Sequence, residues 1–211
     1  MRPGTVFPDS LRFAILFLAT LLVASSAPAA NSGDCVRGVP SAPIKIEVFS
    51  DFQCPACRAF YLSTMSIVMS EYADAGKACI VYREFPLSIH NHARQAAQFG
   101  HAAMKVGVRQ WNQVTDALFK AQDAWAASGN IESVVANVLA KADLEALHKE
   151  LRNTAALDAA IDADIQLGMQ RGVNSTPTFF VTAGGRTEKI AAAVSYPILK
   201  RYLDSLLAKG N

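Results

Sequence analysis

The sequence predicts an α/β fold whose sheet is interrupted in its middle by a block of helices. A segment with strand alternation, a segment with helical spacing and a second apolar segment follow one another over about forty residues, the pattern of a right-handed parallel unit. Strand character then disappears for about eighty residues and returns near the end of the chain. The 211 residues are 51% hydrophobic and 18% charged, enough apolar material for one sizeable core.

An apolar leader precedes this core. Arg2 and Arg12 give it a positive start, residues 13–24 are an unbroken apolar run, and residues 27–29 (APA) offer small residues for cleavage. Such a run rises only about 18 Å as a helix, against roughly 30 Å of membrane hydrocarbon. We expect residues 1–29 to be a cleaved signal peptide, with a membrane anchor as the alternative. The mature protein would then act in the periplasm or another extracytoplasmic space, where disulfides persist.

After an N-terminal segment of residues 30–43, the first half of the core is predicted to fold as strand, helix and strand. Residues 44–49 alternate Ile and Val with Lys and Glu, typical of a strand with one strongly apolar face. Residues 54–72 place apolar side chains at steps of three and four, as a helix does. Residues 79–85 form the second strand, and the first half of the core extends to residue 90.

The helical block spans residues 91–171, which are rich in Ala, Leu, Gln and Lys. Trp111 and Trp125 should pack in its core. Four or five helices are expected, with breaks at Gly107, residues 128–130, residues 141–143 and residues 153–154.

The second half of the core is predicted for residues 172–211. Residues 178–181 and 187–190 flank a Gly-Gly turn and read as a hairpin. A last helix over residues 195–209 should bury one apolar stripe, which includes Ile198.

The pair Cys54 and Cys57 follows a strand and opens a helix. Unpaired backbone N–H groups and the helix dipole favour a thiolate at Cys54, and Cys57, one turn on, lies within bonding distance and can expel a mixed disulfide. Pro55 restricts the loop and Ala56 supplies neither donor nor charge, so the helix terminus should provide most of the stabilisation. An inert disulfide or half of a zinc site is the alternative. The sequence holds no second Cys-x-x-Cys or Cys-His cluster, so we predict redox chemistry without a metal or cofactor.

A second feature is Thr176-Pro177, which lies directly ahead of a predicted strand. A proline in this place suits a cis peptide bond. A plain turn proline is the alternative, and the residues alone favour it.

Three segments together resemble the DsbA family of thiol:disulfide oxidoreductases. They are residues 49–57 (FSDFQCPAC), residues 85–90 (FPLSIH) and residues 172–178 (GVNSTPT). The resemblance implies a thioredoxin-like fold, a central mixed sheet flanked by helices, with the helical block inserted as a subdomain. It also implies a cis bond before Pro177, facing Cys54 and offering a backbone edge to an extended substrate.

The chain departs from the family pattern at two positions. Ala56 stands where DsbA has a histidine, so that enzyme's strongly oxidising potential is not carried over. Val48 stands where many thioredoxin-like proteins keep a buried acid. Glu84 could substitute for this acid, but the rarity of buried carboxylates favours a solvent-facing salt bridge with Arg83 or a neighbour.

Two further pairs of residues could carry chemistry. His90 and His92 point to different sides of a helix start, and we interpret them as packing or capping residues. Cys35 and Cys79 are both expected at the end of the sheet opposite the active cysteines. They form either a structural disulfide or a buried Cys79 beside a free Cys35.

These patterns predict an exported oxidoreductase that donates a Cys54–Cys57 disulfide to reduced exported polypeptides through a mixed disulfide. Only about fourteen mature residues precede Ile44, too few for the dimerisation domain of the family's isomerases and reductases, so a monomeric oxidase is favoured. The resemblance implies reoxidation by a membrane quinone-linked partner of the DsbB or vitamin K epoxide reductase-like type. A net charge of +2 with no basic stripe argues against nucleic acid. A disulfide reductase or isomerase, or a non-redox peptide-binding chaperone, is the alternative.

Overall fold

The computed structural model describes Met1 and residues 34–209. The leader expected at residues 1–29 lies outside the described residues, except for Met1. Among the helices that are described, none combines the length and the apolar character needed to cross a membrane.

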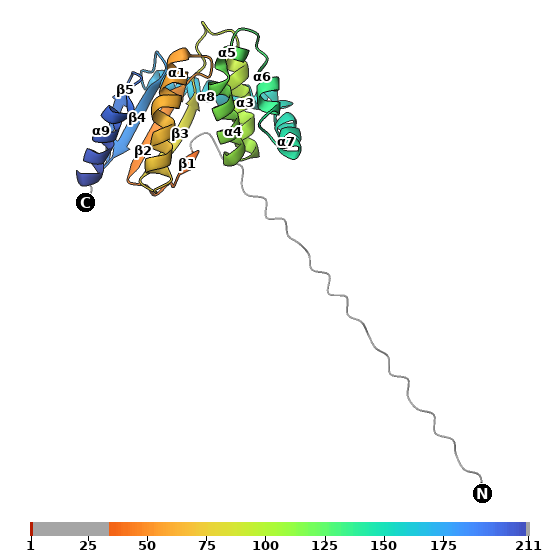
Figure 1. Ribbon diagram of the computed structural model, residues 1–211, viewed down its shortest axis with the longest axis horizontal. Coiled ribbons are helices and arrows are strands. Elements are labelled where there is room, and N and C mark those ends of the chain that lie inside the picture. Colours follow the sequence, from red (N-terminus) through yellow and green to blue (C-terminus); the bar gives the residue numbers. More distant parts are fainter. Residues whose placement is uncertain (2–33, 210–211) are drawn as a thin grey trace.

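A mixed sheet forms the centre of the described chain (Figure 1), as the sequence predicts. Its strand order is β1-β3-β2-β4-β5, with β2 and β3 parallel and the other neighbouring pairs antiparallel. The short strand β1 was not expected from the sequence. The strands are β1 (Arg37–Gly38), β2 (Ile44–Ser50), β3 (Ala78–Glu84), β4 (Thr178–Ala183) and β5 (Arg186–Ile190).

The helix after β2 and the last helix cover one face of the sheet. The first of these is continuous but contains two π-helical stretches, and it buries Phe60 and Val68. The last helix, α9 (Tyr196–Lys209), buries Leu199 and Leu203. Ile198 is 53% exposed, so its predicted burial is wrong: the apolar stripe follows the i, i+4 pair of leucines, and the preceding position turns outward. The segments of the first helix are α1 (Pro55–Phe60), η1 (Tyr61–Met65), α2 (Ser66–Val68) and η2 (Met69–Ala73).

Between β3 and β4 the described chain is helical, as predicted, but it holds six helices instead of four or five. The break expected at residues 141–143 is wrong, because Ala140 is extended and a helix begins at Lys141. The non-helical segment therefore lies a few residues earlier. The helices are α3 (Ala93–Val106), α4 (Val108–Lys120), α5 (Gln122–Trp125), α6 (Ile131–Ala136), α7 (Lys141–Leu151) and α8 (Thr154–Gln170).

Helix α8 packs on the other face of the sheet through a cluster that includes Phe49, Phe85 and Phe180. Its close approach depends on Gly168, where an added β-carbon would lie 2.6 Å from the Phe85 ring. A larger residue there would push the helix away from the sheet.

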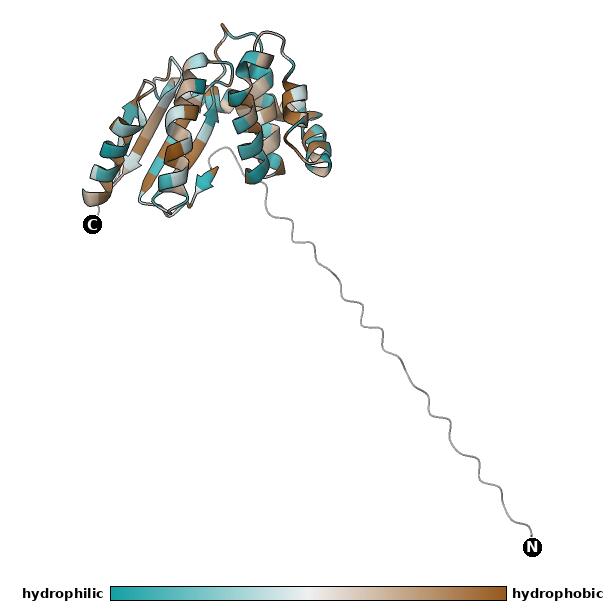
Figure 2. Ribbon diagram, in the orientation of Figure 1, coloured by the Kyte–Doolittle hydropathy of each residue, from teal (hydrophilic) through white to brown (hydrophobic). Residues whose placement is uncertain are grey.

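The helical block and the sheet share one continuous core. Tyr61 of the first helix stacks on Phe119 of α4, with ring centroids 4.7 Å apart, and Tyr82 of β3 lies 5.1 Å from Trp111. Trp111 and Trp125 are fully buried, as predicted. The helices of this block show both polar and apolar segments in Figure 2, as amphipathic helices over a core do.

Candidate active site

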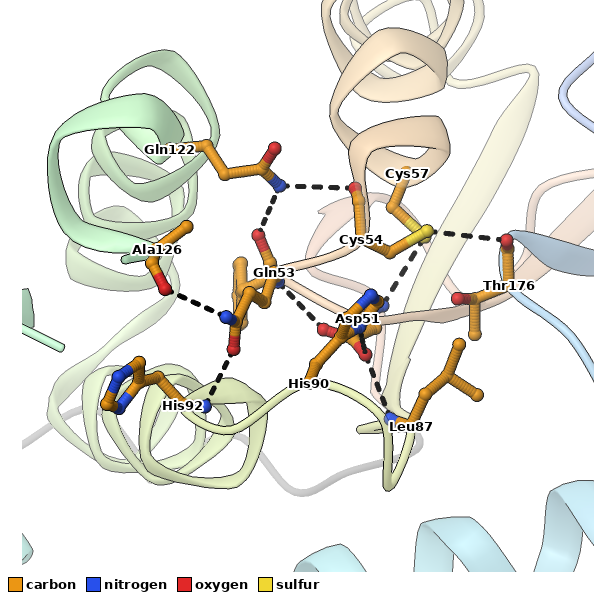
Figure 3. A network of polar contacts seen from close by, with 11 residues as sticks. Asp51, Gln53, Cys54, Cys57, Leu87, His90, His92, Gln122, Ala126 and Thr176 are labelled. Atoms are coloured by element: carbon orange, nitrogen blue, oxygen red, sulfur yellow. Dashed lines mark hydrogen bonds and ion pairs between the residues drawn. The ribbon is translucent and has the colours of Figure 1, made fainter. Parts of the chain in front are cut away.

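The Cys-x-x-Cys motif lies at the point where strand β2 ends and the first helix begins (Figure 3). Cys54 occupies the N-cap position in an extended conformation, with φ −73° and ψ 121°. Pro55 follows in the first helical turn, where its missing N–H costs no hydrogen bond. Cys57 is one turn into the helix and faces the core, while Pro55 and Ala56 are exposed.

Both cysteines of the motif are free thiols in this structure, and both are buried. The exposed fraction is 6% for Cys54 and 1% for Cys57. The Cys54 sulfur lies 3.5 Å from the carbonyl oxygen of Thr176, to which the protonated thiol donates. The bond between Thr176 and Pro177 is cis, as the resemblance implied. Segments about 120 residues apart thus meet at one sulfur atom.

The pKa values of the two thiols are shifted in opposite directions. The side chain of Cys57 donates a hydrogen bond to Cys54, and the backbone N–H groups of Cys57 and Ala56 add to it, so that the pKa of Cys54 falls to about 5 despite burial. Burial, and after it the neighbouring Cys54, raise the pKa of Cys57 well above its usual range. We expected the helix terminus to provide most of this stabilisation; the largest single cause is instead the neighbouring thiol, and the individual backbone N–H groups rank after it.

Two polar residues that the sequence did not single out, Asp51 and Gln122, hold the loop of the motif. The buried carboxylate of Asp51 accepts from the backbone N–H of Gln53 at 2.7 Å and from that of Leu87 at 2.9 Å. From helix α5, Gln122 donates to the carbonyl oxygens of Phe52 and Cys54. Only Asp51 had a sequence signal, since it directly follows a strand and precedes the motif. Gln122 had none, because it is distant in the chain.

The side chain of Gln53, which belongs to the loop itself, also bonds the loop to the helical block. Its amide nitrogen donates to the carbonyl oxygen of Ala126 at 2.8 Å, and its amide oxygen accepts from the backbone N–H of His92 at 2.7 Å. The motif is therefore bonded to the inserted helices by one side chain from the loop, Gln53, and by one from the helical block, Gln122.

The two histidines behave differently from each other. His90 lies in the loop before helix α3, and its Nδ1 is 2.7 Å from Oδ2 of Asp51. His92 is the N-cap residue of α3 but makes no side-chain capping bond, and its ring lies against Gly129. In the described part of the chain, no group of three or more His, Cys, Asp or Glu side chains is arranged to hold a metal ion.

Glu84 is buried, which corrects the expectation of a solvent-facing salt bridge with Arg83. Arg83 pairs instead with Glu47 at 2.8 Å and with Asp164 at 3.0 Å. Glu84 lies on the opposite side of the strand, against Gly100, where an added β-carbon would lie 2.6 Å from Oε1 of Glu84. Burial, followed by the charges of Asp164 and Asp51, raises the pKa of Glu84 well above its usual range.

Cys35 and Cys79 are joined by a disulfide, which decides between the two alternatives left open by the sequence. Cys79 lies near the start of β3, opposite Lys45 of β2. The bond is therefore at the opposite end of the sheet from Cys54, which follows the end of β2.

The comparisons with known proteins agree with this geometry. The sequence profile of the thioredoxin family matches residues 30–205. The "Probable disulfide bond formation protein D" of Bacillus cereus is 25% identical over 176 residues, covering 82% of this chain and 78% of that protein. Among solved structures, alpha-DsbA1 of Wolbachia pipientis has a TM-score of 0.69 at 22% identity, covering 82% of this chain and 90% of that one.

The fold is also that of BdbD from Bacillus subtilis in its oxidised form. The TM-score is 0.67 at 19% identity, over 85% of this chain and 98% of that one. The fold is thus shared with DsbA-type proteins, and the chain belongs to the thioredoxin family.

Proposed function

We propose that this protein is an exported oxidase that donates a Cys54–Cys57 disulfide to reduced polypeptides outside the cytoplasm. The observation that carries the proposal is the difference between the two thiols: Cys54 has a pKa of about 5, and the pKa of Cys57 is well above its usual range. Stabilising the Cys54 thiolate stabilises the reduced enzyme, and a stabilised reduced form makes the disulfide a stronger oxidant.

The reaction proceeds in two exchanges. A substrate thiolate attacks Sγ of Cys54, the Cys54–Cys57 bond breaks, and Cys57 leaves as a thiolate that takes up a proton. A second substrate thiolate then attacks the substrate sulfur of the mixed disulfide, and Cys54 leaves as a thiolate. Two electrons pass from the substrate dithiol to the enzyme, which a membrane quinone-linked partner of the DsbB or vitamin K epoxide reductase-like type reoxidises.

The substrate would lie in extended form along Thr176 and Pro177. The carbonyl oxygen of Thr176 is 3.5 Å from the Cys54 sulfur, so a backbone paired with this segment brings its own cysteine to the reacting atom. Recognition through backbone groups suits a monomeric enzyme with many unrelated substrates. The roles of Cys54, Cys57, Pro55, Ala56, Thr176 and Pro177 are part of this proposal.

Serine variants of the two cysteines test the reaction. With a reduced, unfolded protein as substrate, Cys54→Ser should abolish disulfide transfer. Cys57→Ser cannot close the ring. When it is given a polypeptide that carries a disulfide, its Cys54 thiolate should attack that disulfide, release one substrate thiolate and accumulate as a mixed disulfide, visible by mass spectrometry. If Cys54→Ser instead retained full refolding activity, the protein would act as a chaperone and the proposal would be wrong.

The direction of transfer is tested by equilibration with glutathione. We expect a reduction potential clearly less negative than the roughly −270 mV of thioredoxin. A value at or below that of thioredoxin would indicate a reductase.

A further inference from the structure

The loop between strand β3 and helix α3 passes directly beside the Cys-x-x-Cys motif (Figure 3). It starts where the backbone N–H of Phe85 donates to the carbonyl oxygen of Ser50 at 2.8 Å, and it turns where the N–H of His90 donates to the carbonyl oxygen of Leu87 at 3.0 Å. This turn directs the His90 ring at Asp51, and the ring is only 17% exposed.

The carboxylate of Asp51 has no exposed surface, so it depends on hydrogen bonds from buried partners. Its donors are the N–H groups of Gln53 and Leu87 and the Nδ1 atom of His90. Oδ2 of Asp51 accepts from Nδ1 of His90 in the tautomer that carries its proton on Nδ1. His90 is the one side chain among these donors.

The backbone of Asp51 contacts the redox pair itself. Its N–H points at Sγ of Cys57, with a separation of 3.5 Å. This hydrogen bond lowers the pKa of Cys57, against the larger effect of burial, and so favours the thiolate. One residue thus has its side chain fixed by His90 and its N–H directed at the inner sulfur.

We propose that His90 is a positioning residue for the inner thiol: its bond to the Asp51 carboxylate holds the Asp51 N–H against Cys57 while that sulfur carries negative charge. The inference rests on the proposed function and adds a residue to it. Cys57 is a thiolate when it leaves the disulfide and again when it attacks Cys54, so the same N–H assists both directions of the exchange.

The step that isolates this effect is ring closure on a glutathione adduct. When reduced enzyme meets oxidised glutathione, the Cys54 thiolate attacks one glutathione sulfur and one reduced glutathione leaves. The Cys57 thiolate then attacks Sγ of Cys54, the second glutathione leaves, and its thiolate takes up the proton from Cys57. The first exchange depends on Cys54 as nucleophile and the second on Cys57.

Two amide variants of His90 separate a positioning role from simple filling of space. In asparagine the amide nitrogen is attached to Cγ, as Nδ1 of histidine is, whereas in glutamine it is attached one bond farther out. His90→Asn therefore keeps a donor toward Asp51 and His90→Gln misplaces it. His92→Gln is the matched control, because the His92 ring lies against Gly129 and not against Asp51.

The measurement is rapid acid quenching followed by mass spectrometry of the glutathione adduct on the full protein. In His90→Gln we expect ring closure to slow by about fivefold, the loss of roughly one net hydrogen bond, so that the adduct accumulates. Its formation by Cys54 should change less. His90→Asn and His92→Gln should close the ring within about twofold of the native rate. His90→Ala, which removes the donor without adding volume, should behave like His90→Gln.

Unchanged ring closure in His90→Gln and His90→Ala would overturn the inference, as would an equal slowing of both exchanges. If these two variants unfold while His90→Asn remains native, His90 is a structural residue and the inference is also overturned. The proposed function fails on a different result, namely that the native enzyme forms no adduct or never resolves it.

Discussion

At the scale of single residues, the acidity of Cys54 depends first on its partner thiol. The side chain of Cys57 is the largest cause of the lowered pKa, which is about 5. We therefore expect the alkylation rate of Cys54 to rise with pH through about 5 and to be flat by neutral pH, followed together with thiolate absorbance. In a Cys57→Ala variant the midpoint should move up toward the ordinary value of about 8.5. A native midpoint near that value would contradict the structure.

Glu84 gives a pH-dependent prediction for stability. In the unfolded chain its proton leaves near pH 4.5, but in the fold the proton is retained to higher pH. The folded state binds more protons over this window, so raising the pH above about 4.5 costs stability, by up to about 1.4 kcal/mol per pH unit. Glu84→Gln stays neutral and removes this cost.

The measurement is urea unfolding of the native protein and of Glu84→Gln at a series of pH values. The stability advantage of the variant should be small near pH 4 and should grow toward neutral pH. Glu145→Gln on α7, where the side chain is exposed, is the control and should show no such trend. An advantage that stays constant with pH would mean that Glu84 is ionised in the fold.

The site residues that the sequence predicts and those that it does not predict differ in how far their contacts reach along the chain. Cys54 and Cys57 stand in one short motif whose spacing is itself the chemical signal. Glu84, Asp51 and Gln122 depend on distant partners: Gln122 bonds to a carbonyl 70 residues away. Burial and pairing of this kind follow from tertiary packing, which a local pattern does not contain.

At the scale of elements, the disulfide compensates for a very short strand. Strand β1 has two residues and pairs with β3 at the edge of the sheet. Cys35 and Cys79 are 44 positions apart. Closing such a loop lowers the entropy of the unfolded chain, which in the loop-entropy model raises the free energy of unfolding by about 4 kcal/mol. The double variant Cys35→Ala/Cys79→Ala should lose about this free energy of unfolding in urea.

A variant without the redox pair tests the contribution of this disulfide alone. In Cys54→Ala/Cys57→Ala, Cys35–Cys79 is the remaining disulfide, so adding a reductant should cause a similar loss of stability. A loss below about 1 kcal/mol in both experiments would show that the packing of β1, and not the cross-link, holds this edge.

The elements themselves were largely predictable because each carries its own period. The strands β2 and β3 and the helix between them followed from alternation and helical spacing within about forty residues. The number of helices in the insertion did not, since α5 has four residues and α6 has six, too few to show a period. The π-helical stretches of the first helix had no sequence signal.

At the scale of the whole molecule, the helical insertion and the sheet are joined at the active site by polar contacts. Gln122 is 3% exposed, and its amide donates to two carbonyl oxygens of the active-site loop. Gln122→Leu would leave these carbonyls buried without that donor, which costs on the order of 1–3 kcal/mol. Stability should fall accordingly in urea unfolding, and amide exchange should accelerate in α5 and in residues 51–54.

Gln170→Leu is the matched control, because Gln170 is exposed at the end of α8. It should leave both stability and exchange close to native. If Gln122→Leu also left stability and amide exchange unchanged, the apolar core alone would hold the helical insertion and the sheet together.

The near-complete enclosure of Cys54, of which 6% is exposed, has a consequence for when this protein can act. A thiol fixed inside a finished globular protein cannot be brought to such a sulfur, whereas one on a pliable stretch of newly made chain can. Under the proposed function, a substrate therefore has to react before its folding is complete, because its cysteines are inaccessible afterwards.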